Sequence, residues 1–315
     1  MNAISSAILE LTLIAVFGFV LYRRAYIGEQ VLKALTSFVI IFTVPALIFT
    51  HLIEQSRSIL EAPILSFVFM SVAIFAGGCL LGLIFSSILR GRLRQEIVCC
   101  VSLQNSGYLP MSLAVFLFPP ALREEFLVYI FLYLLGFDVI MWSIGSFFIF
   151  KRKGQRFRLA SLVTPPVAAI LAALILIYTR ADRFLPEIVL APMRRVGELS
   201  FVLSMLVLGS WLAKVDVRGL RRYVFPVIGV AVFKLVVLPF IFLAGTLTLG
   251  ITSLTGLFIV LQAAMPSAAT LPVVGQMHGA DNEFISQAVF LTHLISIITI
   301  PIWLNLYLTL SGFSW

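Results

Sequence analysis

Long apolar runs recur along this chain of 315 residues, and they constrain its fold more than any other feature. A helix needs about 20 apolar residues to cross the hydrocarbon core of a bilayer. With 61% of residues hydrophobic and 11% charged, no soluble fold of this length could bury so much apolar surface. The sequence therefore predicts an all-α integral membrane protein with ten transmembrane helices, at residues 3–22, 32–53, 63–89, 96–118, 126–150, 162–179, 197–213, 224–249, 254–277 and 284–310.

Basic residues are distributed unevenly between the loops that join these spans. One set of alternate loops holds 15 of the 22 Lys and Arg residues and the other holds 6, with Lys234 inside a span. Short cytoplasmic loops are enriched in Lys and Arg. We therefore predict a multi-pass protein of the cell membrane with both termini outside. The net charge of +8 is a topology signal, and we expect no nucleic acid partner. Only the pair Arg194–Arg195 fits the outer side poorly.

A basic loop at residues 151–159 divides the chain into two parts, 1–150 and 160–315, with five predicted spans each. An odd number of spans per part means that the two parts insert with opposite orientation, as an inverted repeat. The fourth span of each part is interrupted by proline and small residues, at Asn105-Ser-Gly-Tyr-Leu-Pro110 and at Ala264-Met-Pro266-Ser-Ala. Matching interruptions in two halves point to the binding site of a transporter.

Interrupted helices supply the chemistry of such a site. Proline removes a backbone donor, and the free backbone groups cannot face lipid, so they line a cavity or contact a ligand. The N-terminal end of each following half-helix carries a partial positive charge and unpaired N–H groups, which suit an anion. The alternative is that each proline simply kinks a membrane helix. The candidate substrate-binding residues are Asn105, Ser106, Gly107, Tyr108, Pro110, Gln262, Met265, Pro266 and Ser267.

Two ionisable residues lie inside predicted spans, Asp138 in the fifth and Lys234 in the eighth. Each costs about 2.5–3.5 kcal/mol at the centre of an isolated membrane helix, so both should face the protein interior. We interpret them as candidates for proton coupling or for compensating the charge of an anion. A static ion pair or snorkelling of the long side chain is the alternative. His293 could titrate near neutral pH or simply hydrogen-bond a neighbouring helix.

Other chemical classes find no support in the sequence. The three cysteines, Cys79, Cys99 and Cys100, lie in or beside apolar runs and lack the spacing of a metal site. No nucleophile elbow, zinc-protease motif or Walker loop occurs. We therefore expect no enzymatic activity, no cofactor, no metal and no ATP-driven step.

Several short segments, spread in order over almost the whole chain, resemble the auxin efflux carrier family. They are Thr43-Val-Pro45-Ala-Leu-Ile-Phe49, Asn105-Ser-Gly-Tyr-Leu-Pro110, Pro165-Pro166-Val-Ala, Leu208-Gly209, Ala263-Ala-Met-Pro266-Ser-Ala and Phe290-Leu-Thr-His-Leu-Ile-Ser296 running into Ile-Thr-Ile-Pro301. The resemblance implies ten helices in a five-plus-five inverted repeat, with spans four and nine as crossed broken helices. It also implies a transport domain beside a scaffold, small organic anions as substrates and a homodimer.

The sequence thus predicts a transporter of a small organic anion, such as a simple carboxylate, an auxin-like acid or a dicarboxylate. Protons are the candidate coupling ion. A sodium-coupled symporter of the distantly similar bile-acid type is one alternative. Those proteins carry a carboxylate shortly before the second interruption, where this chain has the uncharged Gln262, and sodium usually favours some negative charge among its oxygen ligands. A membrane sensor that binds without transporting is the other alternative.

Overall fold

The computed structural model describes residues 3–90, 93–141, 163–215, 220–272, 275 and 280–314. Within this part of the chain every regular element is helical, and an isolated antiparallel bridge joins Gln104 and Ser267. The predicted basic loop at 151–159 lies outside the described residues.

The helices follow the order of the apolar runs. The first half holds α1 (Ala3–Arg23), α2 (Glu29–Phe38), η1 (Val39–Thr43), α3 (Val44–Glu54), α4 (Ser56–Glu61), α5 (Ile64–Ile88), α6 (Arg94–Ser102), α7 (Tyr108–Leu117) and α8 (Pro120–Ile140). The second half holds α9 (Pro165–Tyr178), η4 (Ala181–Phe184), α10 (Glu187–Leu212), α11 (Leu220–Val232), η5 (Phe233–Val237), α12 (Leu238–Thr248), α13 (Leu254–Ala264) and α15 (Asn282–Ser311).

Six helical stretches in the described residues are long and apolar enough to cross a membrane. They are Ile4–Arg23, Glu29–Glu54, Ile64–Ile88, Glu187–Leu212, Arg222–Thr248 and Asn282–Ser311. Shorter apolar helices occupy Tyr108–Leu117, Pro165–Tyr178 and Leu254–Ala264. α8 is long enough to span, but it carries Arg123, Glu124 and Glu125 near its start and Asp138 near its end. The protein is therefore a helical integral membrane protein, and the count of ten spans stays a prediction.

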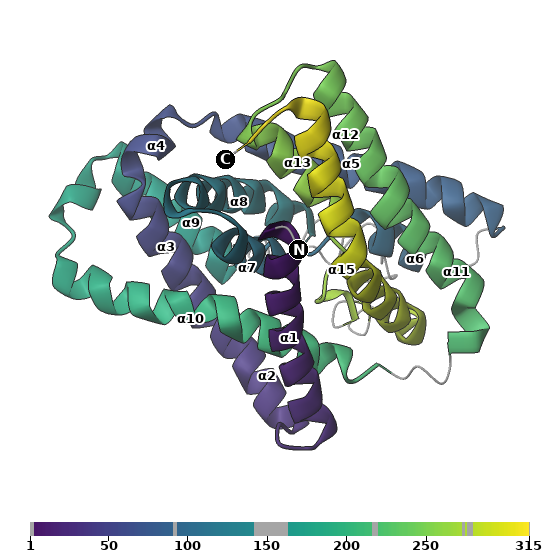
Figure 1. Cartoon of the computed structure of the whole chain (residues 1–315). Helices are drawn as coiled ribbons and strands as arrows, with labels where there is room; N and C mark the ends of the chain where they lie inside the picture. The colour runs from purple at the N-terminus through teal and green to yellow at the C-terminus, as the bar shows by residue number, and fades with distance from the viewer. Residues whose placement is uncertain are drawn as a thin grey trace, which may run out of the picture.

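The helices pack in two groups. In the first group, α1, α2 and α3 pack against α10, and α9 packs against α3. The second group consists of α5, α6, α8, α11, α12, α13 and α15, and α7 contacts α1 and α10 of the first group and α8 of the second. Figure 1 shows α3, α9 and α10 on one side and α11, α12 and α15 on the other, with α1 between them. α1 and α10 approach very closely where glycines face the neighbouring helix. A Cβ at Gly18 or Gly209 would overlap a backbone carbonyl of the facing helix.

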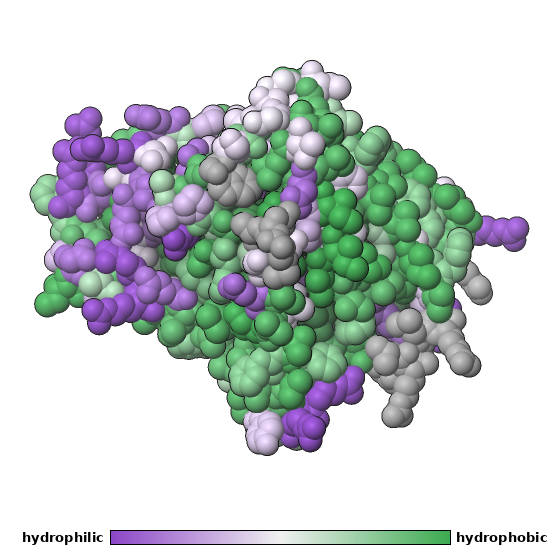
Figure 2. Space-filling model, viewed as in Figure 1, coloured by the Kyte–Doolittle hydropathy of each residue, from purple (hydrophilic) through white to green (hydrophobic). Residues whose placement is uncertain are grey.

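Much of the surface is apolar, as lipid contact requires. Large hydrophobic side chains are exposed on helices of both groups, among them Phe17, Phe69, Phe240 and Ile298. Figure 2 shows this apolar surface as a broad area over α1, α11 and α15, with hydrophilic side chains gathered toward the ends of the molecule. Water would penalise such an exterior, whereas the hydrocarbon core of a bilayer accommodates it.

α10 begins well before the predicted seventh span, and this explains the outer arginine pair. Arg194 and Arg195 lie on the helix rather than in a loop. Arg194 forms an ion pair with Glu54 at the end of α3, and its Nη2 lies 3.1 Å from a carboxylate oxygen of Glu187. Hydropathy alone placed the start of the predicted span after these charges, but the helix begins earlier, at Glu187, and carboxylates of Glu54 and Glu187 pair with Arg194.

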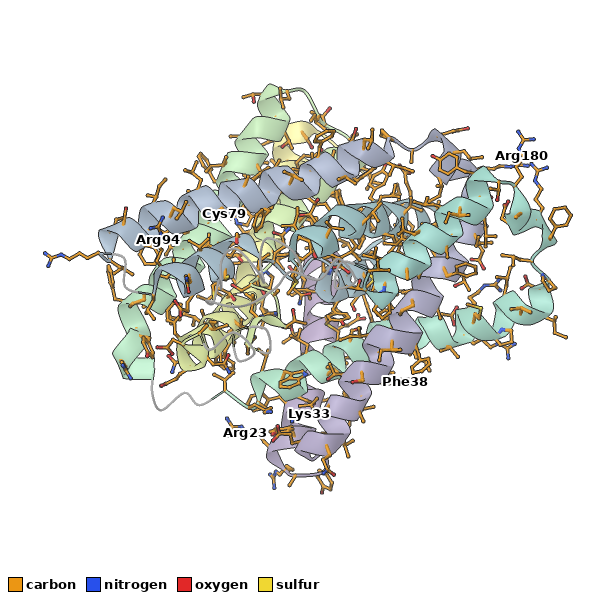
Figure 3. The ribbon with its side chains drawn as sticks, turned by 180° about the vertical axis from the view of Figure 1, so that it is seen from behind. Arg23, Lys33, Phe38, Cys79, Arg94 and Arg180 are labelled. Atoms are coloured by element: carbon orange, nitrogen blue, oxygen red, sulfur yellow. The ribbon has the colours of Figure 1, made fainter. Side chains whose placement is uncertain are left out.

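Charged residues that the sequence assigned to opposite sides lie at opposite ends of the fold. Figure 3 shows Arg23 and Lys33 at the bottom of the view and Arg94 at the left, all far from Arg180 at the upper right. Which end faces the cytoplasm stays a prediction.

In the described residues, a π-helical segment comes shortly before a proline at two places. η1 precedes Pro45, and η5 precedes Pro239. Proline cannot donate to the turn before it, so the backbone widens there. The segment η5 contains Lys234, and the sequence analysis did not predict this distortion.

Candidate functional site

The two interrupted helices meet in the interior through their breaks. The first break separates α6 from α7, and the second follows the end of α13. Across the breaks, the Asn105 amide donates to the Pro266 carbonyl at 2.8 Å, and the Ala268 amide donates to the Leu103 carbonyl at 2.9 Å. Each break therefore satisfies backbone groups of the other, which a membrane interior demands.

Side chains from the second half lock this crossing. Ser267 Oγ donates to the Cys100 carbonyl at 2.6 Å, and its amide donates to Thr292 Oγ1 at 3.3 Å. Gln262 Nε2 donates to the Ser106 carbonyl at 3.2 Å. Gln262, Met265 and Ser267 are all fully buried. These predicted site residues thus hold the two breaks together.

A cavity of about 180 Å³ lies beside the first break. Its wall brings together predicted residues from two elements, since the run Asn105–Tyr108 faces it along with Asp138 of α8. No side chain in the described residues caps the first turn of α7, whose N-cap is Gly107. The remaining lining residues are Ile40, Val44, Gln104, Met111, Leu134, Phe137, Met141, Thr164, Pro165, Pro166, Ala268, Ala269 and Thr270.

Asp138 is held by a residue that the sequence analysis did not single out. Thr164 Oγ1 donates to Asp138 Oδ2 at 3.0 Å and also accepts from the Val167 amide at 3.3 Å, which makes Thr164 the N-cap of α9. Threonine followed by two prolines is a recognisable helix start, so the cap was visible in the sequence. Its contact with Asp138 was not, because the two residues belong to different helices.

Lys234 lies away from this cavity and contacts the break from another side. The ammonium is fully buried, and its Nζ lies 3.4 Å from Gln104 Oε1. Gln104 Nε2 in turn contacts the hydroxyl of Tyr133 at 2.6 Å. Lys234 and Asp138, both within the described residues, form no ion pair with each other.

His293 joins the site from α15. Its Nε2 lies 3.3 Å from Asn105 Nδ2, and its Nδ1 lies 2.8 Å from the Val289 carbonyl. His293 also borders a larger cavity of about 460 Å³ between α1 and α15, whose wall is mostly aliphatic and aromatic. Sequence reasoning weighed His293 without placing it, because nothing in the linear order brings it to Asn105.

The predicted site residues therefore fall into two sets. Asn105, Ser106, Gly107, Tyr108 and Asp138 border the cavity. The others lie within the surrounding protein and do not border it: Pro110, Gln262, Met265, Pro266, Ser267 and Lys234.

A helical membrane protein whose two broken helices meet inside the fold, beside a cavity, has the architecture of secondary transporters. The comparisons with known proteins agree. A family described as membrane transport proteins matches residues 3–161 and 155–304. The chain belongs to this family, the auxin efflux carriers, and is a multi-pass membrane transporter.

Two archaeal relatives, both described as uncharacterized transporters, extend over nearly the whole chain. The protein from Methanothermobacter thermautotrophicus is 24% identical over 308 residues, which cover 95% of this chain and 97% of the relative. The protein from Methanocaldococcus jannaschii is 23% identical over 287 residues, which cover 87% of this chain and 89% of the relative.

Proposed function

We propose that this transporter carries a small organic anion, with a carboxylate group bound beside the first break. The observation that carries this proposal is the uncapped start of α7, which faces the 180 Å³ cavity together with Asn105 and Ser106. Amide groups at a helix N-terminus attract negative charge, and the Asn105 and Ser106 side chains add hydrogen-bond donors. The cavity volume suits a small molecule rather than a polymer.

A neighbouring cavity borders the same site on one side. A second cavity, of about 260 Å³, shares Ala269 with the site cavity. It extends past Trp211 to Lys214, a residue on the side predicted to be cytoplasmic. We propose that the anion reaches the site from the cytoplasm through this second cavity. The proposal also includes the predicted architecture: ten spans in an inverted repeat, both termini outside and a homodimer.

Proton coupling through Asp138 completes the proposed mechanism. Asp138 shares the cavity wall with Asn105, so a proton on its carboxyl group would remove a negative charge next to the bound anion. Without a coupled ion, a membrane potential that is negative inside would drive export, at about 2.3 kcal/mol per charge per 100 mV. Proton binding at Asp138 would instead link anion movement to the proton gradient.

The test is transport current from proteoliposomes on a solid-supported membrane, challenged with monocarboxylates, dicarboxylates and indole acids. We expect a saturable current for one class of anion, unaffected by sodium and lost in Asn105→Ala. Electroneutral exchange produces no current, so we would detect it by counterflow of radiolabelled substrate. A current that requires sodium would replace the proposal with a sodium symporter, and anion binding without current or counterflow would indicate a sensor.

A further inference from the structure

Lys234 is a buried cation without an anionic partner among the described residues. Its side chain is 0% exposed, and none of the ion pairs in the described part of the chain includes it. Its polar contact is with the side-chain oxygen of Gln104, at 3.4 Å. A neutral amide alone compensates a buried ammonium poorly, so Lys234 keeps its charge only where the surroundings supply further negative potential.

The local backbone holds this side chain in place. Lys234 lies in η5, a π-helical turn between α11 and α12 that packs against α6, α13 and α15. The Leu235 carbonyl, one residue further on, accepts a hydrogen bond of 2.7 Å from Trp303 Nε1 of α15. Single π-helical turns inside α-helices occur frequently at functional sites. The turn therefore fixes the start of the lysine side chain against the broken helices.

The broken helices supply the negative potential. α6 runs into the crossing and ends at Ser102, and α13 runs into it and ends at Ala264. The C-terminal end of a helix carries roughly half a negative charge. At the end of α6 this potential persists although the Cys100 and Leu103 carbonyls accept from Ser267 and Ala268. On the last turn of α13, the fully buried Gln262 Oε1 has no hydrogen-bond partner among the described residues. The ends of α6 and α13 and the Gln262 side-chain oxygen thus give the crossing a negative electrostatic potential, which would stabilise a cation.

We propose that the Lys234 ammonium is a tethered cation, which neutralises the converging C-terminal ends of α6 and α13 and takes the place of a mobile coupling cation. Half-helix C-termini in broken membrane helices are where carriers commonly coordinate sodium. Here the protein supplies the positive charge itself. The contact of Lys234 with Gln104, the residue before Asn105, holds the first break in position. Lys234 is therefore a positioning residue, acting on the site through Gln104.

The experiment is chemical rescue of the full-length protein. Lys234→Ala leaves space for a small cation, and thermal stability is measured with rising methylammonium chloride. Tetramethylammonium chloride, too large for the vacated space, controls for ionic strength. We expect the melting temperature of Lys234→Ala to rise saturably with methylammonium alone and that of the wild type to stay unchanged. This arm needs no substrate, so its failure is distinct from failure of the anion proposal.

Transport supplies the second readout, and this arm rests on the proposed function. We expect Lys234→Ala to lose at least about tenfold in transport rate, as for a lost hydrogen bond to a charged group, and to regain it with methylammonium. Lys234→Arg should keep the rate, and the neutral Lys234→Met, of similar size, should lose it. If Lys234→Met transports like the wild type, or if methylammonium rescues neither stability nor rate, the tethered-cation role is overturned. If Lys234→Ala does not fold, the transport rates of Lys234→Met and Lys234→Arg still test the tethered-cation role.

Discussion

Asn105 of the first break and His293 of α15 meet at 3.3 Å, between the Asn105 side-chain amide and Nε2 of the imidazole ring. Because His293 Nδ1 lies 2.8 Å from the Val289 carbonyl, Nδ1 donates and Nε2 accepts from Asn105. The ring is therefore neutral in this conformation. It orients the Asn105 amide at the cavity wall and links the break to a helix that is distant in sequence.

Removing this acceptor should weaken anion binding. In His293→Leu the buried Asn105 amide loses its partner, which costs about 1–3 kcal/mol and should lower the apparent affinity by about tenfold. In His293→Gln the amide oxygen can accept in place of Nε2, so we expect affinity near the wild-type value. The measurement is the substrate dependence of counterflow. Equal affinities for the Leu and Gln variants would show that the contact does not orient Asn105.

Replacing Asp138 should remove the response to a proton gradient. Asp138→Asn keeps the shape of the side chain and an acceptor for Thr164 Oγ1, but it cannot release a proton. We expect wild-type anion uptake to change with an imposed pH gradient, and uptake by Asp138→Asn to be the same with and without it. Glu61→Gln, an exposed carboxyl in α4, is the matched control. A pH response that persists in Asp138→Asn would assign coupling to another group.

The crossing of the two breaks should depend on Ser267. Ser267→Ala deletes a buried hydrogen bond to the Cys100 carbonyl, and we expect a loss of about 1 kcal/mol in the free energy of unfolding. Ser296→Ala is the control, because the Ser296 hydroxyl donates to the His293 carbonyl within its own helix. Thermal denaturation in detergent should show a larger drop in melting temperature for Ser267→Ala. The reverse order would mean that this bond is not a main tie between the breaks.

The close approach of α1 and α10 should tolerate no side chain at Gly209. A Cβ there would overlap the Ala15 carbonyl, so the two helices must separate in Gly209→Ala. We expect destabilisation by about 1–3 kcal/mol, as for other overpacked sites. Gly245→Ala in α12 is the matched control, because its Cβ would meet no atom within 4 Å. That variant should be neutral or stabilised by up to about 1 kcal/mol, since alanine favours the helix.

Membrane sidedness can be tested at the two ends shown in Figure 3. Single cysteines replace Glu29, near Lys33, or Arg183, near Arg180, both of which are exposed. We expect a membrane-impermeant maleimide to label Arg183→Cys in intact cells and Glu29→Cys only after permeabilisation. The wild type, with its three native cysteines, gives the background. Labelling in the opposite order would invert the predicted topology.

The sequence by itself determined that the chain is a helical membrane protein and where its helices break. Apolar runs and the shortage of charge leave a bilayer as the only solvent for this surface. The interruptions at Asn105–Pro110 and around Pro266 followed from local chemistry, because proline and small residues end a helix wherever they occur. Helix boundaries failed where a charge was neutralised by a distant partner, as for Arg194.

Only the tertiary structure decided which of those residues share a cavity. Asp138 and Lys234 looked alike in sequence, as single charges in apolar spans, yet one borders the cavity with Asn105 and the other lies behind the break against Gln104. The contacts of His293 with Asn105 and of Thr164 with Asp138 were equally hidden. Periodicity and composition report what each helix can bury. Which side chains meet depends on how separate helices cross, and that is set by the packing of many residues at once.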